Sequence, residues 1–600
     1  MTLAESLAKQ QRSISVAEFF EKNKHLLGFD SPTRGIITTI KEAVDNALDA
    51  CEEAEVLPDI YIAIKKVDTD VFRIIVEDNG PGIVPENVPF VFGKLLYGSR
   101  FHQIRQSRGQ QGIGISAAVL YAQLTTGVPT TVISRTGHDF PAYFFELMIK
   151  TEKNEPHIIK KEIIDWDRTH GTRVEIEFKS NLSAKRRLLD YLKYTAVVNP
   201  HARIQADIAG EMLTFERATN ETVTPPQAIA PHPYGTEFGQ LKRMASVSDE
   251  TVFAFLTNGF SRVGKKSAQD ILGIARIKET RKANRLKTED LKALLEAMQS
   301  VHIPPPPASQ CLSPIGEEMI VSGLDKEFQL DFVKAKTRKS QVFSGHPFIV
   351  EAAIGYGGKL DQEGSARILR FANRVPLIYQ QGACAITNAI SEVNWRSYNL
   401  SQQGLPTGPI LILVHVASTN VPFTSESKDA VAAIPEIERE IVLALQDLGR
   451  ELKTYISRRD RNKQDENRAR AICSILPEIA AKVSEIVGKP VPDISPLEGQ
   501  IMRRVICRKK TDNGMVKISV ANYTAKPVTV MVYAVSADTA KDASVPPDFV
   551  DSIGEEFNKV WRCEVASQNT WEVTYTGTPG GSIDLRGVDE KMKVVVDVDI

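Results

Sequence analysis

Glycine is placed in the N-terminal region in a pattern that few folds can accommodate. Two glycines, Gly80 and Gly82, come directly after a predicted strand, and three more lie within residues 109–114, just before a run with helical periodicity. Because glycine lacks a Cβ, such turns let the backbone come very close to a bound molecule or to another segment. The region is therefore predicted to be an α/β domain whose binding site is lined by backbone.

A helix is predicted over residues 35–53, where apolar residues recur at helical spacing among good helix formers. Glu42 and Asn46 stand four positions apart, so both side chains project from one face of this helix. A carboxylate beside an amide oxygen suits Mg²⁺, which keeps several waters and takes few protein ligands beside phosphate groups. We expect Asn46 to hold the metal and Glu42 to orient an attacking water. A solvated acidic helix face is the alternative for such a short motif.

Residues 59–77 contain two β-rich runs separated by a polar turn and are predicted to form a hairpin. Asp78 follows this hairpin, and a buried carboxylate at a strand end is a good acceptor for the exocyclic amine of adenine. Gly80 and Gly82 would let the backbone approach the base. The alternative is an ordinary Asp-Asn-Gly turn, but the second glycine and the preceding strand favour adenine recognition.

The third segment places glycines at 109, 112 and 114, immediately before the helical run 115–124. Backbone N–H groups of such a loop can converge on phosphate oxygens, and the helix N-terminus adds partial positive charge. The segment is therefore predicted to cradle the phosphates of a nucleotide.

A lid is predicted over residues 92–107, which are polar and basic and contain two glycines. Lys94, Ser99 and Arg100 are its candidate contacts to a nucleotide. Farther along, Thr172 precedes an alternating strand and is expected to support Asp78 or a bridging water.

A Glu/Asn helix, an Asp-x-Gly-x-Gly turn, a glycine-rich lid and a late Gly-Thr in this order resemble the GHKL ATPases. The sequence segments KEAVDNALDA, VEDNGPGI and SRGQQGIGISAA are most similar to those of the B subunits of the topoisomerase VI (type IIB) family. The resemblance implies binding and hydrolysis of ATP with Mg²⁺. It also implies that Lys428, in a polar loop of a second α/β domain, reaches the γ-phosphate of the nucleotide.

The resemblance further implies partners. Two copies of the chain would dimerise when ATP binds and would close a gate on double-stranded DNA. We identify no acidic cluster with a tyrosine that could cut DNA, so cleavage is assigned to the A subunit of the family, in an A₂B₂ assembly.

Glu42 and Lys428 are the residues assigned to catalysis, and Asn46 is assigned to the metal. The positions assigned to nucleotide binding are Asn46, Asp49, Asp78, Gly80, Gly82, Lys94, Ser99, Arg100, Gly109, Gln110, Gln111, Gly112, Ile113, Gly114, Ile115, Ser116, Thr172 and Lys428.

The chain of 600 residues is expected to form several domains. We predict a multidomain α/β protein with a GHKL (Bergerat) α/β sandwich over residues 1–228 and a small module resembling the helix-two-turns-helix fold over 229–307. A transducer-like α/β domain is predicted for 308–490, with strands followed by long helices over 435–456 and 464–487. Residues 491–600 are predicted to be a linker and an immunoglobulin-like β-sandwich, because their apolar residues alternate at period two.

The helical module carries a modest surplus of basic residues, and two interpretations of it stay open. It is a DNA contact, or it is a solvated helical spacer, since a few surplus charges are common on surfaces. The basic residues include Arg262, Lys265, Lys266, Arg281, Lys282, Arg285 and Lys287.

Composition limits which other functions, bound metals and cellular locations are expected. The formal net charge of −1 gives no general sign of nucleic-acid binding, so any DNA contact must be local. The six cysteines lack Cys-x-x-Cys spacing, which argues against a zinc site and a disulfide framework. No run long enough to span a membrane and no signal-peptide core are found, so a cytoplasmic location is expected.

Two other functions remain open on the sequence alone. One is a gyrase-like or MutL-like ATPase with the same nucleotide site and different partners, although the helical module argues against both. The other is a nucleotide-gated clamp or chaperone, in which ATP sets shape and turnover is incidental.

Overall fold

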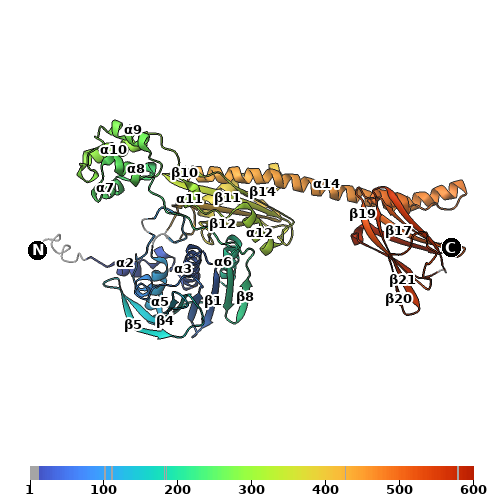
Figure 1. Ribbon diagram of the computed structural model, residues 1–600, viewed down its shortest axis with the longest axis horizontal. Coiled ribbons are helices and arrows are strands. Elements are labelled where there is room, and N and C mark those ends of the chain that lie inside the picture. Colours follow the sequence, from blue (N-terminus) through green and yellow to red (C-terminus); the bar gives the residue numbers. More distant parts are fainter. Residues whose placement is uncertain are drawn as a thin grey trace. The chain divides into compact units, whose positions relative to one another are not determined.

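The structure is a computed structural model that describes residues 13–100, 103–109, 112–181, 183, 185–425, 428–577 and 580–599. The chain divides into two compact units, Met1–Tyr455 and Ile456–Ile600, and each is described by itself (Figure 1).

An eight-stranded sheet forms the base of the first unit, in the order β5-β4-β3-β6-β2-β1-β7-β8. Neighbouring strands are antiparallel except β1 and β7, which run parallel. The hairpin predicted for residues 59–77 is confirmed as β1 and β2. The strands are β1 (Asp59–Lys66), β2 (Val71–Glu77), β3 (Thr130–Arg135), β4 (Ala142–Lys150), β5 (Glu155–Ile164), β6 (Gly171–Lys179), β7 (Arg203–Ile208) and β8 (Glu211–Phe215).

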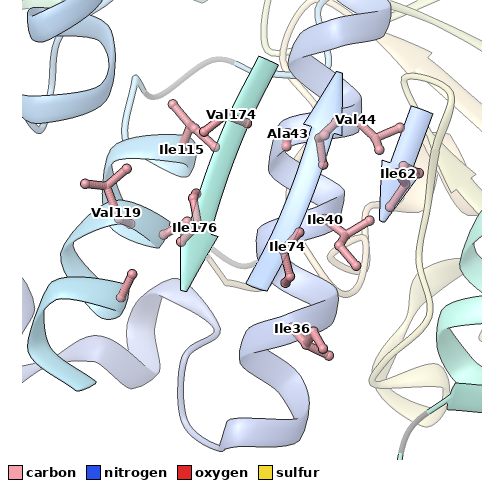
Figure 2. Packing of buried hydrophobic residues seen from close by; sticks show 14 of the residues in the cluster. Ile36, Ile40, Ala43, Val44, Ile62, Ile74, Ile115, Val119, Val174 and Ile176 are labelled. Atoms are coloured by element: carbon pink, nitrogen blue, oxygen red, sulfur yellow. The ribbon is translucent and has the colours of Figure 1, made fainter. Parts of the chain in front are cut away.

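Helices pack on this sheet and bury its apolar side chains, as Figure 2 shows for α3 and α5 against β1, β2 and β6. Helix α3 begins after Ser31, whose side chain accepts a hydrogen bond from the Arg34 N–H, and Pro32 occupies its first turn. Ile36, Ile40 and Val44 recur at helical spacing and are almost fully buried. The helices here are α2 (Val16–Lys22), α3 (Pro32–Glu53), α4 (Val88–Gly93), α5 (Gly114–Thr126) and α6 (Lys185–Val198), with the 3₁₀ helix η1 (Lys24–Leu27).

A small helical module follows with its own core, in which Leu256, Ile271 and Leu294 are fully buried. The chain enters it through η2 (Pro233–Gly235). Its helices are α7 (Phe238–Ser246), α8 (Val252–Gly259), α9 (Lys265–Ala275), η3 (Ala283–Arg285) and α10 (Thr288–Ser300).

A second sheet of six strands completes the first unit. Its order is β10-β11-β16-β12-β13, with β9 also paired to β11. β12 and β16 run parallel and are joined through α13, whereas β11 and β16 are antiparallel. The elements are α11 (Ala308–Cys311), α12 (Glu317–Phe328), β9 (Phe332–Thr337), β10 (Gln341–Phe343), β11 (His346–Tyr356), β12 (Arg367–Ala372), β13 (Val375–Pro376), η4 (Gln381–Ala383), α13 (Ala385–Glu392), η5 (Trp395–Tyr398), β14 (Ser401–Gln403), β15 (Leu405–Thr407) and β16 (Ile410–Ser418). Helix α14 (Pro435–Val487) begins in the first unit and continues into the second.

The second unit contains two four-stranded sheets, ordered β22-β18-β17-β24 and β20-β21-β19-β23. Trp561 and Tyr575, from strands of different sheets, lie in one shared core. The elements are α15 (Ser495–Met502), β17 (Val505–Asp512), β18 (Met515–Asn522), β19 (Val528–Ser536), β20 (Phe549–Ile553), β21 (Glu556–Val565), β22 (Asn569–Thr576), β23 (Ser582–Arg586), η6 (Glu590–Met592) and β24 (Lys593–Asp599).

The predicted fold class, a multidomain α/β protein with a C-terminal β-sandwich, is confirmed. The helices predicted over 435–456 and 464–487 are parts of one helix, because α14 is continuous over 53 residues. Residues 457–463 lack an apolar face, but their arginines and lysine are good helix formers and their charges are solvated, so nothing interrupts the helix.

Candidate nucleotide-binding site

A cavity of about 510 Å³ opens between α3, the end of β2, α4 and the start of α5, and the second α/β domain closes one side of it. Most of the sequence-predicted site residues line this cavity. They are Glu42, Asn46, Asp78, Gly82, Ser99, Arg100, Gly109, Gly112, Ile113, Gly114, Ile115, Thr172 and Lys428. Gln110 and Gln111 lie outside the described residues. The remaining predicted residues lie beside the cavity and not in its wall; they are Asp49, Gly80, Lys94 and Ser116.

Glu42 and Asn46 lie one turn apart on α3, as predicted, and both face the cavity. The Glu42 carboxylate packs directly against Gly114, the first residue of α5: a Cβ at that glycine would lie 1.8 Å from Glu42 Oε2. Asn46 faces the loop before α5, because a Cβ at Gly109 would lie 3.8 Å from Asn46 Oδ1. The carboxylate and the amide therefore lie beside the glycine-rich loop.

Asp78 lines the cavity where β2 ends. Its Oδ1 accepts hydrogen bonds from the N–H groups of Gly80, at 2.8 Å, and Thr172, at 3.2 Å. Burial raises the pKa of Asp78 to about 6, although these two bonds act in the opposite direction. Gly80 thus supports the carboxylate from outside the cavity. A fixed, buried carboxylate is suited to accept a hydrogen bond from an amine of a ligand.

Gly82 and Thr172 complete the wall around Asp78. Gly82 has φ +71°, and a Cβ there would lie 2.1 Å from the carbonyl oxygen of Arg135, so only glycine fits. The Thr172 hydroxyl shares a hydrogen bond of 3.2 Å with the Ser134 hydroxyl, which fixes its position.

The loop before α5 presents backbone to the cavity. Gly112 has φ +58°, and Ile113 caps α5 without a side-chain hydrogen bond. The N–H groups of the first helical turn have no partners within the helix, and Gly114 and Ile115 of this turn line the cavity, which is the arrangement that binds anions. Ser116 is buried and donates to the carbonyl oxygen of Ile113, so it stabilises this turn from behind.

The lid residues divide between two roles. Ser99 and Arg100 line the cavity, and Arg100 forms ion pairs with Asp49 and Glu53 of α3. Lys94 lies at the end of α4, where its ammonium is 6.0 Å from the ring centroid of Phe90. Asp49 therefore pairs with Arg100 of the lid and with Arg108 just after it, and it does not line the cavity.

Two buried charged residues of α3, one in the cavity wall and one beside it, were not predicted. Lys41 lines the cavity, and burial lowers its pKa despite the nearby charges of Glu42 and Asp45. Asp45 is buried one turn away, and neither of its carboxylate oxygens has a hydrogen-bond partner among the described residues. Burial raises its pKa to about 7, with Lys41 opposing the shift. The spacing of four between these two residues was a usable signal.

The second α/β domain contributes a loop that reaches the site. Lys428, with φ +53°, donates a hydrogen bond from Nζ to the carbonyl oxygen of Arg108 at 2.9 Å. Asp429 forms an ion pair with Arg34 of α3, and the Arg34 guanidinium lies 4.7 Å from the ring centroid of Tyr379. Asp429 and Tyr379, which were not predicted, thus hold this loop against the N-terminal domain.

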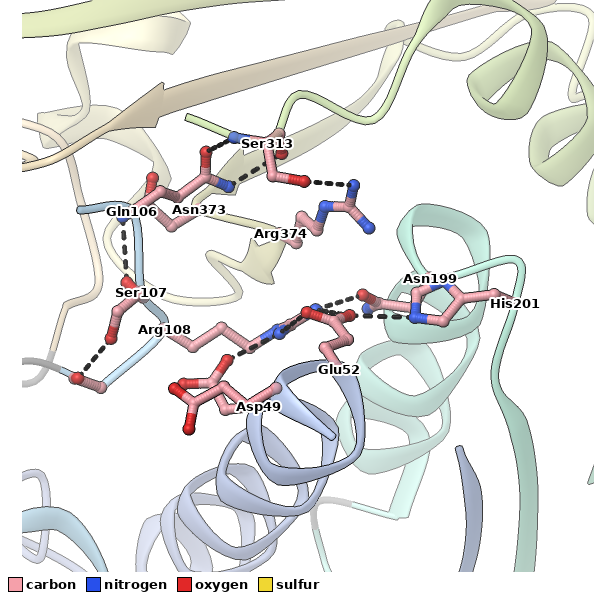
Figure 3. A network of polar contacts seen from close by, with 12 residues as sticks. Asp49, Glu52, Gln106, Ser107, Arg108, Asn199, His201, Ser313, Asn373 and Arg374 are labelled. Carbon is pink, nitrogen blue, oxygen red and sulfur yellow. Dashed lines mark hydrogen bonds and ion pairs between the residues drawn. The ribbon is translucent and has the colours of Figure 1, made fainter. Parts of the chain in front are cut away.

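A buried polar network joins the same two domains behind the glycine-rich loop (Figure 3). On the side of the second α/β domain, His415 Nδ1 lies 2.8 Å from Glu351 Oε2, and the Arg374 backbone N–H donates to His415 Nε2 at 2.9 Å. Because a backbone N–H can only donate, Nε2 is the acceptor and the proton of the neutral ring is on Nδ1. Burial lowers the pKa of His415, in keeping with this neutral form.

Three family models match the chain. Residues 32–181 match the histidine kinase-, DNA gyrase B- and HSP90-like ATPase family, and residues 307–468 match the transducer of the topoisomerase VI B subunit. Residues 488–595 match the C-terminal domain of the type 2 DNA topoisomerase 6 B subunit. No described helix is both long and apolar enough to cross a membrane.

Curated relatives match over nearly the whole chain. The type 2 DNA topoisomerase 6 B subunit of Methanococcoides burtonii is 48% identical over 96% of this chain and 94% of its own length. That of Archaeoglobus fulgidus is 47% identical, over 95% of each chain.

Proposed function

The chain belongs to the family of type 2 DNA topoisomerase 6 B subunits, and from this premise we propose that it is the ATP-binding and ATP-hydrolysing subunit of a type IIB DNA topoisomerase. Dimerisation of two copies on ATP would gate the passage of one DNA duplex through a double-strand break, which relaxes supercoils and decatenates. The observation that carries the proposal is a single cavity lined by Glu42, Asp78 and the transducer residue Lys428.

The two ends of the cavity suit the two ends of ATP. Asp78, held by two backbone N–H groups, would accept a hydrogen bond from the adenine amine. The N-terminus of α5 would bind the phosphates through backbone N–H groups. Glu42 lies beside Gly114 at this phosphate end, where it can orient or deprotonate a water for attack on the terminal phosphate.

The residues present fit Mg²⁺ only when phosphate oxygens share its coordination. Among the described residues no group of three or more His, Cys, Asp or Glu side chains could hold a metal ion. Asn46 offers one amide oxygen beside the glycine-rich loop, which matches a cation that keeps waters and takes few protein ligands. When bound there, the ion would neutralise charge on the phosphates.

Lys428 would transmit the state of the bound nucleotide to the rest of the protein. An ammonium group has three N–H donors, so its bond to the Arg108 carbonyl is compatible with further bonds to the terminal phosphate. A ligand shifts an equilibrium only through contacts that differ between states. Loss of the terminal phosphate would remove such contacts and release the transducer.

Partners follow from the family and from surface charge. The subunit name of the relatives implies an A subunit, and we assign DNA cleavage to it in an A₂B₂ assembly. We also assign local DNA contact to the helical module, where Arg262, Lys265 and Lys266 lie around the start of α9 and both lysines are exposed. Substituting the two lysines by glutamine should then weaken DNA binding and flatten its dependence on salt.

The proposal is tested by combining the purified chain with the A subunit of the same source and assaying relaxation of supercoiled DNA. We expect relaxation that requires ATP, Mg²⁺ and both subunits. Glu42→Ala should abolish turnover while nucleotide binding persists. Hydrolysis at the unmodified rate in this variant would remove Glu42 from the mechanism, and ATP turnover without DNA relaxation would favour the clamp or chaperone alternative.

A further inference from the structure

Arg108 lies at the junction of three parts of the site. It directly precedes Gly109, so its backbone belongs to the loop that faces the phosphate end of the cavity. Its carbonyl oxygen accepts the hydrogen bond from Lys428 Nζ at 2.9 Å. Its side chain extends away from the cavity into the buried network of Figure 3 and is almost fully buried. One residue thus contacts the nucleotide loop, α3 and the transducer.

The Arg108 guanidinium is anchored on α3 by a fork of ion pairs. Nη1 donates to Asp49 Oδ1 and Glu52 Oε2, both at 2.7 Å, and Nη2 donates to Glu52 Oε1 at 2.7 Å and Asn199 Oδ1 at 2.6 Å. Such a bidentate pair fixes direction as well as distance. Arg108 therefore has little freedom to move relative to α3, the helix that carries Glu42 and Asn46.

The carboxylates of this anchor are themselves held. Glu52 Oε1 lies 2.9 Å from His201 Nε2. Burial alone would raise the pKa of Glu52, but the Arg108 charge and the His201 bond outweigh it and hold the pKa well below its usual range. Glu52 is thus charged at neutral pH, and the fork persists throughout the physiological range.

The residues before Arg108 are bonded to the transducer. The Ser107 carbonyl accepts a hydrogen bond from Asn373 Nδ2 at 3.0 Å. The Gln106 side chain accepts from the Ser313 N–H at 2.8 Å and donates to the Ser313 carbonyl at 3.1 Å. Residues 106–108 therefore form a short bridge, which binds the transducer through Gln106 and Ser107 and binds α3 through the Arg108 side chain.

We propose that Arg108 is a positioning residue: its anchored guanidinium sets the place of the carbonyl oxygen that receives Lys428, and so couples the nucleotide site to the transducer. The inference rests on the proposed function, because Lys428 is the group through which it acts. The Arg108 side chain itself touches neither nucleotide nor water in this role. A purely structural arginine would instead support the fold without any dependence on Lys428.

A double-mutant cycle separates these roles, with kcat and KM for ATP measured on the full chain carrying Arg108→Gln, Lys428→Met or both. Residues that act as a unit are non-additive. We expect Arg108→Gln to lower kcat by about tenfold or more while the Kd of a non-hydrolysable ATP analogue changes by less than about threefold. In the Lys428→Met background the same substitution should change kcat by less than about twofold. Losses that multiply in the double variant would overturn the proposal.

Two further variants keep the test decisive. If the Arg108→Gln variant does not fold, Glu52→Gln takes its place in the cycle, because this change weakens the ion pairs and leaves the arginine present. The loss of kcat caused by Glu52→Gln should also vanish in the Lys428→Met background. The matched control is Arg338→Gln, which removes an arginine paired with Glu440 and Asp447 outside the cavity wall and should leave kcat unchanged. Wild-type protein without ATPase activity would refute the proposed function itself, whereas active wild type with multiplying losses refutes only the role of Arg108.

Discussion

The Glu42 carboxylate occupies the space in which a side chain at residue 114 would begin. A Cβ on Gly114 would lie 1.8 Å from Glu42 Oε2 and 2.6 Å from its Cδ, far inside van der Waals contact. The glycine at the start of α5 thus serves two purposes, since it exposes the helix N-terminus and also admits the carboxylate of α3. The position of Glu42 is therefore set by the glycine-rich loop as much as by its own helix.

Gly114→Ala should displace the Glu42 side chain and lower kcat for ATP by about tenfold or more, because a catalytic group moved by about 1 Å loses its alignment with the reacting atoms. Steady-state hydrolysis measures this. Gly273→Ala is the control: this helical glycine has open space around it, and alanine there should leave kcat unchanged. Unaltered hydrolysis by Gly114→Ala would show that Glu42 does not need its observed place.

Glu42→Gln should retain nucleotide binding and lose hydrolysis, since the amide keeps the size of the side chain but cannot accept a proton from water. Binding is measured by titration with a fluorescent ATP analogue, and hydrolysis by phosphate release. Equal loss of both would instead assign Glu42 to binding.

Asp45→Asn should stabilise the protein in a manner that depends on pH. Burial raises the pKa of Asp45 to about 7 in the folded chain, against 3.8 for a free side chain. The folded state therefore binds the proton more tightly, and the wild type loses stability as pH rises from about 4 to about 7. The advantage of the variant should grow across this window to on the order of 3 kcal/mol and level off above it. Urea denaturation at pH 5 and pH 8 tests this, and an equal difference at both would contradict the assigned pKa.

Asp429→Asn should weaken the attachment of the Lys428 loop, because it removes the charge that pairs with Arg34 in a largely buried position. We expect a loss of about 1–3 kcal/mol in the free energy of unfolding, together with a lower kcat. Arg450→Gln breaks an exposed pair with Asp447 and should cost less than about 0.5 kcal/mol. Similar losses in both variants would argue against a special role for the Asp429 pair.

Local sequence pattern was sufficient to predict the elements that carry the site. The apolar spacing of Ile36, Ile40 and Val44 predicts α3, and the position of Asp78 after a β-rich run predicts a carboxylate at a strand end. Both depend on neighbours within one element, where periodicity has a direct physical meaning.

Contacts between segments that are distant in the sequence produce no comparable periodic pattern. Tyr379 and Asp429 meet Arg34 only because the transducer folds onto α3, and neither residue stands in a motif. Asp49 shares the predicted face of α3, yet the structure directs it to Arg100 and Arg108, since these arginines lie within reach of its carboxylate. Helical spacing predicts the face of a side chain but not the partner it finds there.

We propose above all that nucleotide binding at this cavity closes two copies of the chain into a dimer. Sedimentation of the purified chain with and without a non-hydrolysable ATP analogue and Mg²⁺ tests it most directly. We predict a shift from monomer to dimer that Glu42→Ala retains and Asn46→Ala abolishes. A chain that binds the analogue but stays monomeric, both alone and with the A subunit present, would contradict the nucleotide-closed gate.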